Sequence, residues 1–282
     1  MRGVVSAGMT AALERLALTT CFDLVVGASA GAINGAALIG GVARYGAATF
    51  HGPLASRSFV NPARLLRGRP VIDVNYVLNF ASSDLDAARH ERVLDSPIEL
   101  HCVAVSVEDA QPVAFSGMST KRDLLDALLA TSRMPWAGGP PVEIDGRRYL
   151  DGALLGAPVP VAEAIAAGAT HVLVLQTRPY GEPRKSASKA ADLLIERYLR
   201  KLNPALLALY GDRFDSYERV VNDIARRTLH PVAGPPHVLG LRPPAGTPVV
   251  SQTERRSQIL AAAATQAERI VEQALCLEAT AR

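Results

Sequence analysis

The sequence predicts a three-layer α/β/α domain with a mostly parallel central sheet over residues 1–180, followed by a mostly helical C-terminal extension over 181–282 that packs on it. The chain has 282 residues, 49% of them hydrophobic, enough for a sizeable buried core. Short apolar runs of strand length alternate with helical patterns through the first part. The second part is dominated by charged amphipathic helix.

The N-terminal elements follow from residue spacing and turn residues. Apolar residues recur at three- and four-residue intervals over 4–18, which predicts a helix. An apolar strand over 22–26 ends at Gly27, and helix-forming residues return over 30–39. This region is therefore predicted to form a helix, a strand, a tight turn and a second helix, in that order.

In the middle of the chain, an expected loop-rich segment is followed by regular helices and strands. Residues 51–80 carry three prolines and are expected to form loop and short helical pieces, with a helix over 84–94. Residues 98–108 are typical of a buried strand, with 112–116 as its partner. A helix over 121–132 ends before a proline.

The last elements of the expected core are short. Residues 142–150 predict two strands around Asp145-Gly146, a pair favoured in hairpin turns. A helix over 160–168 and a strand over 171–177 follow.

The C-terminal region is expected to be largely helical. Charged amphipathic helix covers 185–229, a last strand is expected at 237–241, and a helix occupies 253–279. Ser251 and Glu254 fit a capping box at the start of that last helix.

Charge excludes one class of partner and suggests another. Thirty Lys and Arg against 27 Asp and Glu leave a net charge of +3, too small to indicate a nucleic-acid-binding protein. Residues 178–230 hold eleven Lys and Arg against seven Asp and Glu, which allows peripheral contact with an anionic lipid surface. A solvated helical face is the alternative interpretation.

Cysteine usage and hydropathy favour a cytoplasmic protein. Cys21, Cys102 and Cys276 are odd in number and far apart, so no disulfide framework is expected, and the N-terminus does not read as a secretion signal. The uncharged stretch 24–43 is long enough to span a membrane, yet its glycine and alanine content favours a buried strand, turn and helix.

Gly27-Ala28-Ser29-Ala30-Gly31 is a GxSxG motif between an expected strand and an expected helix. Small neighbours allow a strained turn, and the start of the following helix favours developing negative charge. Ser29 is therefore a candidate nucleophile. A turn without function is the alternative.

A nucleophilic serine needs a base, and two kinds were considered. A Ser-Asp-His triad requires several strands before the motif, and too little chain precedes Ser29. The six histidines are therefore expected to be structural or exposed, with His101 and His171 as core residues of strands. The other candidate is Asp151, which ends an expected strand and is followed by Gly152-Ala153.

The sequences GASAGAINGAAL around Ser29, RRYLDGALLG around Asp151 and the opening RGVVSAGMTAAL together resemble the patatin-like phospholipases over residues 1 to about 180. The resemblance implies a patatin/lysophospholipase-like fold, with Ser29 as nucleophile and Asp151 as base of a Ser-Asp dyad. It implies hydrolysis of acyl esters in phospholipids and related lipids, with no cofactor. The remaining motif residues are Gly27, Gly31, Gly152 and Ala153.

The opening of the chain departs from the family pattern. Family members place a glycine-rich loop, GGGxRG, before the first helix, and its backbone N–H groups form the oxyanion hole. Only Arg2 and Gly3 match the end of that loop, as a remnant, and we expect the rest to be encoded upstream of Met1. An ordinary helix start is equally compatible with these two residues.

The sequence thus predicts a lipid acyl hydrolase that acts through an acyl-enzyme. Two alternatives stay open: a catalytically impaired lipid-binding relative, and an acyl transferase on a related fold that pairs its serine with histidine. No nucleotide-binding or metal-binding motif occurs, and Asp84 and Asp86 are expected to begin a helix rather than to hold a cation. Head group, acyl length and oligomeric state are left unpredicted.

Overall fold

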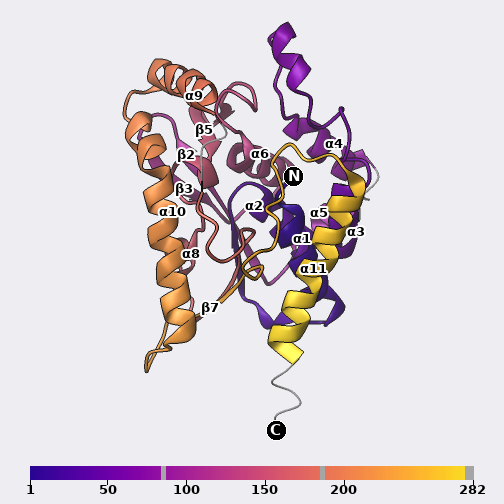
Figure 1. Ribbon diagram of the computed structural model, residues 1–282. Helices are drawn as coiled ribbons and strands as arrows, with labels where there is room; N and C mark the ends of the chain where they lie inside the picture. Colours follow the sequence, from indigo (N-terminus) through magenta and orange to yellow (C-terminus); the bar gives the residue numbers. More distant parts are fainter. Residues whose placement is uncertain (84–86, 185–187, 277–282) are drawn as a thin grey trace.

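The computed structural model describes residues 1–83, 87–184 and 188–276, and it shows an α/β fold with helices on both sides of the strands (Figure 1). The strands are β1 (Leu24–Gly27), β2 (Glu99–Ser106), β3 (Gln111–Phe115), β4 (Val142–Ile144), β5 (Arg147–Asp151), β6 (His171–Leu175) and β7 (His237–Leu241). The α-helices are α1 (Val4–Arg15), α2 (Ala30–Ile39), α3 (Ala43–His51), α4 (Val74–Ser83), α5 (Ala87–Leu94), α6 (Lys121–Ser132), α7 (Gly152–Leu155), α8 (Val161–Ala166), α9 (Lys189–Leu202), α10 (Leu206–Leu229) and α11 (Ser257–Cys276). Two short 3-10 helices are η1 (Thr19–Cys21) and η2 (Pro62–Arg67). The α/β class and the C-terminal helices predicted from the sequence are confirmed.

The strands form a mixed sheet and a separate pair. The main sheet has the order β1-β2-β5-β4, with β3 also paired to β2, and β6 pairs with β7. The β1/β2 and β6/β7 pairs are parallel, while β3, β4 and β5 run antiparallel to their neighbours. A tight connection explains one of the antiparallel pairs: the expected hairpin joins β4 to β5 through Asp145 and Gly146, with φ of 51° and 74°.

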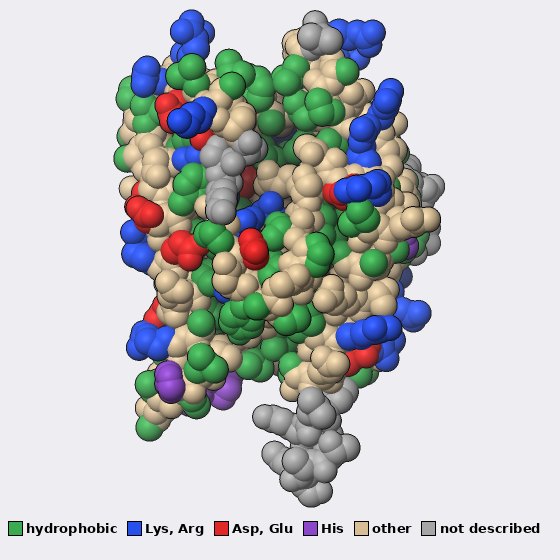
Figure 2. All heavy atoms as spheres, viewed as in Figure 1, with side chains coloured by type: hydrophobic (Ala, Val, Ile, Leu, Met, Phe, Trp, Pro, Cys, Tyr) green, Lys and Arg blue, Asp and Glu red, His purple; other side chains and the backbone are tan. Residues whose placement is uncertain are grey.

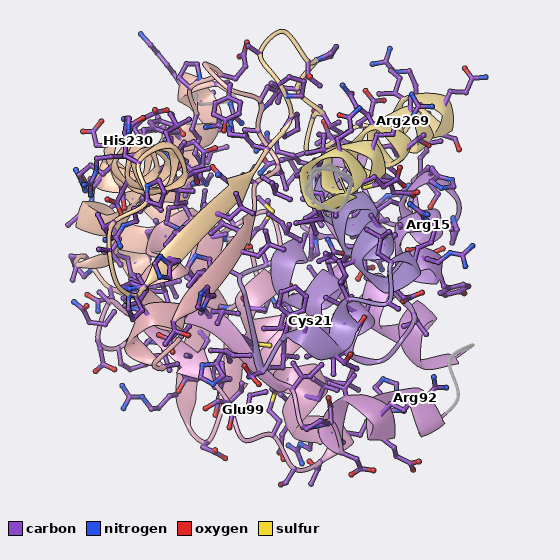
Figure 3. All side chains as sticks on the ribbon, turned by 90° about the horizontal axis from the view of Figure 1, so that it is seen from below. Arg15, Cys21, Arg92, Glu99, His230 and Arg269 are labelled. Atoms are coloured by element: carbon purple, nitrogen blue, oxygen red, sulfur yellow. The ribbon has the colours of Figure 1, made fainter. Side chains whose placement is uncertain are left out.

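Helix α1 lies at the centre of one layer. Every residue from Val4 to Leu13 is buried, and α1 packs against α3 and α11 in one core cluster. Small residues permit the close approach: a Cβ added to Gly8 would lie 2.3 Å from the carbonyl oxygen of Ala264 in α11. In Figure 3, seen from below, the two helices lie side by side, and Arg15 of α1 forms an ion pair with Glu272 of α11.

The opposite layer consists of α9 and α10. They cover β5 and the adjoining part of β2 through a second buried cluster that includes Leu150, Leu199, Leu206 and Tyr210. In Figure 1, α10 stands on the far side of the strands from α1, α3 and α11. The C-terminal region therefore supplies helices to both layers, and it supplies β7 as the partner of β6.

The uncharged stretch 24–43 forms β1, a tight turn and α2, as expected. Across the part of the chain that the structure describes, no helix combines the length and apolar character needed to cross a bilayer.

The predicted capping box at Ser251 and Glu254 is wrong. The Ser251 hydroxyl accepts a hydrogen bond from the N–H of Thr253 instead, and the Glu254 carboxylate binds the Arg256 guanidinium at 2.7 Å. These local bonds hold a turn, and α11 begins at Ser257. The helix expected over 84–94 is observed from Ala87, while residues 84–86, with Asp84 and Asp86, lie outside the described residues.

Candidate active site

Ser29 occupies a strained turn between β1 and α2. Its φ of 55° and ψ of −129° place a non-glycine residue in a region that costs about 1–3 kcal/mol. The turn is tight, because a Cβ added to Gly27 would lie 2.4 Å from the backbone nitrogen of Ala32. A Cβ added to Gly31, by contrast, would have nothing within 4 Å. The backbone thus has the geometry of a nucleophile elbow, with the Ser29 side chain projecting from the helix N-terminus.

Thr131, the penultimate residue of α6, anchors this turn to the sheet. The N–H of Ser29 donates to the Thr131 hydroxyl oxygen at 2.9 Å, and that hydroxyl donates to the carbonyl oxygen of Val103 in β2 at 2.5 Å. Thr131 is fully buried. Thr131 carries no signal in the sequence, because one threonine in a helix does not indicate a contact made 102 positions away.

Asp151 ends β5 and is buried, with 2% of its surface exposed. Its N–H donates to the carbonyl oxygen of Arg133 at 2.9 Å, and its carboxylate accepts from the N–H of Leu154 at 3.0 Å, which caps α7. A Cβ added to Gly152 would lie 2.3 Å from the carbonyl oxygen of Val103. The Asp-Gly pair therefore holds the carboxylate at the end of β5, where Asp151 pairs with Ala104 of β2.

The structure brings Ser29 and Asp151 together. Burial, the largest cause, raises the pKa of the Asp151 carboxyl above its ordinary value. Hydrogen bonding opposes that rise, from the Ser29 hydroxyl first and then from the backbone N–H groups of Leu154 and Ala153. The positive charge of Arg184 also lowers the Asp151 pKa. The carboxylate is thus desolvated, is stabilised by a few specific donors, and lies close enough to the Ser29 hydroxyl for that group to lower its pKa.

Gly3 and Arg2, the two residues that match the end of the family's loop, lie beside the same turn. A Cβ added to Gly3 would lie 2.5 Å from the Cβ of Ala30, so the Gly3 backbone packs against the residue that follows Ser29. The side-chain amide of Asn34 in α2 donates to the Gly3 carbonyl oxygen at 3.0 Å and fixes this approach. Arg2 donates through Nε to the carbonyl oxygen of Val250 at 3.3 Å.

A large cavity of about 880 Å³ adjoins the turn. Ser29, Gly3, Arg2 and Ala153 line it together with mostly apolar side chains. Its volume lies in the upper part of the range found for small-molecule sites. Figure 2 shows a hollow near the centre of one face, with hydrophobic side chains around it and basic side-chain atoms within it.

Two histidines, His90 and His171, are among the residues that line this cavity. His101 is buried in β2, with Nδ1 3.3 Å from Glu163 and Nε2 3.2 Å from Glu99, so it is a satisfied core residue as expected. His171 is exposed, contrary to the expectation of a core position, because it begins β6 at the end of the strand pair. Its ring lies 5.0 Å from that of His237.

Comparison with known proteins gives two matches. The family model described as Patatin-like phospholipase matches residues 1–165. Among curated proteins, the chain is similar to the uncharacterized protein YjjU of Escherichia coli (strain K12), with 32% identity over 180 residues. The match covers 63% of this chain and 49% of YjjU, so the chain spans about half the length of the curated relative it matches.

Proposed function

Since this chain belongs to the patatin-like phospholipase family, we propose that it cleaves carboxylic esters of phospholipids or related lipids through a dyad of Ser29 and Asp151. The observation that carries the proposal is the position of the Ser29 hydroxyl next to a buried carboxylate, at a serine held in a strained turn. A nucleophile and a base within hydrogen-bonding reach are the minimum that acyl transfer to an enzyme requires.

The geometry supports a two-step reaction. Asp151 accepts the Ser29 proton while Oγ attacks the ester carbonyl, and it returns that proton to the departing alcohol, which leaves an acyl-enzyme. Water then attacks the acyl-enzyme, with Asp151 again as the base, and releases the fatty acid. Neither step calls for a metal or an organic cofactor.

Two backbone groups are placed to stabilise the oxyanion. The N–H of Ala30, as the first residue of α2, lacks an intrahelical acceptor, and the Gly3 backbone packs against the same residue. We assign the N–H groups of Ala30 and Gly3 to the oxyanion hole, where the positive end of α2 adds to their effect. The apolar part of the cavity is the proposed site of the acyl chain.

Three variants test the dyad: Ser29→Ala, Asp151→Asn and the double variant. Because the two side chains act as one unit, each single variant is expected to lose nearly as much kcat as the double variant does. The assay is hydrolysis of a lysophospholipid and of a short-chain chromogenic ester, with circular dichroism to confirm folding.

Three histidine variants serve as controls in this assay. His171→Gln, His230→Gln and His237→Gln should each stay within about tenfold of the unmodified protein, an effect below about 1.4 kcal/mol. A loss of about a thousandfold in any of them, or additive losses from Ser29 and Asp151, would assign the base elsewhere. Lipid binding without any turnover would identify the catalytically impaired relative instead.

A further inference from the structure

Three arginines gather next to the proposed dyad. Arg2 precedes α1, whereas Arg178 and Arg184 follow β6, so residues far apart in sequence meet here. Burial, and then the positive charges of Arg178 and Arg184, together lower the pKa of Arg2 to about 10. Arg178 is only 8% exposed. A buried group of like charges is unfavourable unless an anion joins it.

The carboxylates in this region do not balance the three charges. Burial lowers the pKa of Arg184, and the negative charge of Asp151 opposes that fall. The nearby Arg213 has its own partner, Asp192, at 2.9 Å. Among the described residues, two positive charges of the trio therefore remain without a carboxylate.

The guanidinium groups also retain unused hydrogen-bond donors. A guanidinium has five N–H donors. Among the described residues, Arg178 donates one hydrogen bond, to the carbonyl oxygen of Pro183 at 2.6 Å, and its buried Nε has no hydrogen-bond partner. Arg184 donates to the carbonyl oxygen of Ala153 at 3.1 Å, and its guanidinium carbon lies 5.8 Å from the centre of the Tyr217 ring. These donors fit the several oxygens of one phosphate group.

We propose that Arg2, Arg178 and Arg184 bind the phosphate of a phosphomonoester, and that the preferred substrate is an acyl ester of a glycerol phosphate with a terminal phosphate. This inference rests on the proposed function, which places the ester carbonyl at Ser29. A phosphomonoester carries about −1.5 to −2 charges at pH 7, which matches the two unbalanced positive charges. A phosphodiester with a cationic head group carries one negative charge and would bring a further cation into the cluster.

The three arginines lie near the place where the departing alcohol must be protonated. The departing alcohol must approach Asp151 to receive its proton, and Arg184 binds the carbonyl oxygen of Ala153, two residues beyond that base. In an acyl glycerol phosphate the phosphate is only a few bonds from the ester oxygen. Arg2, Ala153 and Tyr217 line the same cavity as Ser29. Arg184 lies directly behind this wall, because it donates to Ala153 and packs over the Tyr217 ring.

The test measures binding in the Ser29→Ala protein, so that its outcome does not depend on turnover. The probes are three ether lipids of one chain length, in which an ether replaces the ester: an O-alkyl glycerol phosphate, its phosphocholine diester and the uncharged O-alkyl glycerol. Calorimetric titration should rank them in that order, with the phosphomonoester at least about tenfold tighter than the diester.

Arginine variants in the same background locate the site. Arg178→Met should weaken the phosphomonoester by about tenfold or more and hardly change the uncharged ether, while Arg178→Lys should restore part of the loss. Arg200→Met, at an exposed arginine of α9, is the matched control and should bind like the parent protein. Inorganic phosphate should compete only weakly, because it lacks the alkyl chain.

Several results would overturn the proposal: equal affinity for monoester and diester, unchanged binding by Arg178→Met, or inorganic phosphate that binds as tightly as the lipid phosphate. If Arg178→Met does not fold, the ranking of the three ethers still decides. If the unmodified protein hydrolyses no ester while Ser29→Ala keeps this ranking, the proposed function fails and the phosphate site stands.

Discussion

Replacing Thr131 by valine tests whether the turn at Ser29 is held by a single hydroxyl. Valine has nearly the same shape, so the change opens no cavity, but the N–H of Ser29 and the carbonyl of Val103 both lose a partner. An unsatisfied buried polar group costs about 1–3 kcal/mol. The Val103 carbonyl lies within a sheet, so most of the loss is expected from the Ser29 N–H.

The expected result is a fall in kcat with KM nearly unchanged, because the acyl cavity keeps its lining while the nucleophile loses its anchor. If the misplacement of Ser29 raises the activation free energy by the full 1–3 kcal/mol, kcat falls roughly fivefold to more than a hundredfold. Thr131→Ser keeps the hydroxyl and should recover most of the activity. Steady-state kinetics and denaturant unfolding, measured in parallel, give both quantities.

A matched control exists elsewhere in the fold. The Thr228 hydroxyl also accepts from a backbone N–H, that of Gly240, and donates to a carbonyl, that of Ile224, each at 2.8 Å. Thr228→Val should therefore lower stability by a similar amount without changing kcat. Equal kcat in Thr131→Val and the unmodified protein would refute the reasoning, since the strained turn would then be held by its own packing.

The two glycines of the GxSxG motif should respond differently to alanine. Gly27→Ala, which places a Cβ 2.4 Å from the Ala32 nitrogen, should prevent a stable fold, whereas Gly31→Ala should raise the unfolding free energy by up to about 1 kcal/mol, as thermal melting will show. Activity should also depend on pH through Asp151, whose raised pKa means that kcat/KM falls as the solution is acidified and the base becomes protonated. Because Arg184 lowers that pKa, Arg184→Gln should move the acid limb of the pH profile to higher pH, and an unmoved limb would exclude Asp151 as the titrating base.

The residues that local backbone geometry requires were predictable from the sequence. Ser29 is recognisable because a strained turn between a strand and a helix needs small neighbours at fixed positions. The Asp145-Gly146 hairpin was predictable for the same reason, since positive φ restricts the residues that fit.

Residues that act through distant contacts were not predictable. Thr131 meets Ser29 across 102 positions, and Arg178 joins Arg2 only through the packing of the folded chain. Local signals also fail where a competing local bond is stronger. At Ser251 and Glu254 the ion pair with Arg256 holds a turn where the pattern predicted a helix start.

The packing of α1 against α11 determines the order in which the chain can fold. The ion pair that joins them links residues 257 positions apart, so a contact of very high sequence separation completes the layer beside the Ser29 turn. During synthesis the apolar residues of α1, among them Val4, Met9 and Leu13, are made long before Leu260 and Val271, which complete their cover. All of the chain between α1 and α11 must therefore be made before this layer is complete, and until then part of the apolar face of α1 is open to non-native contacts.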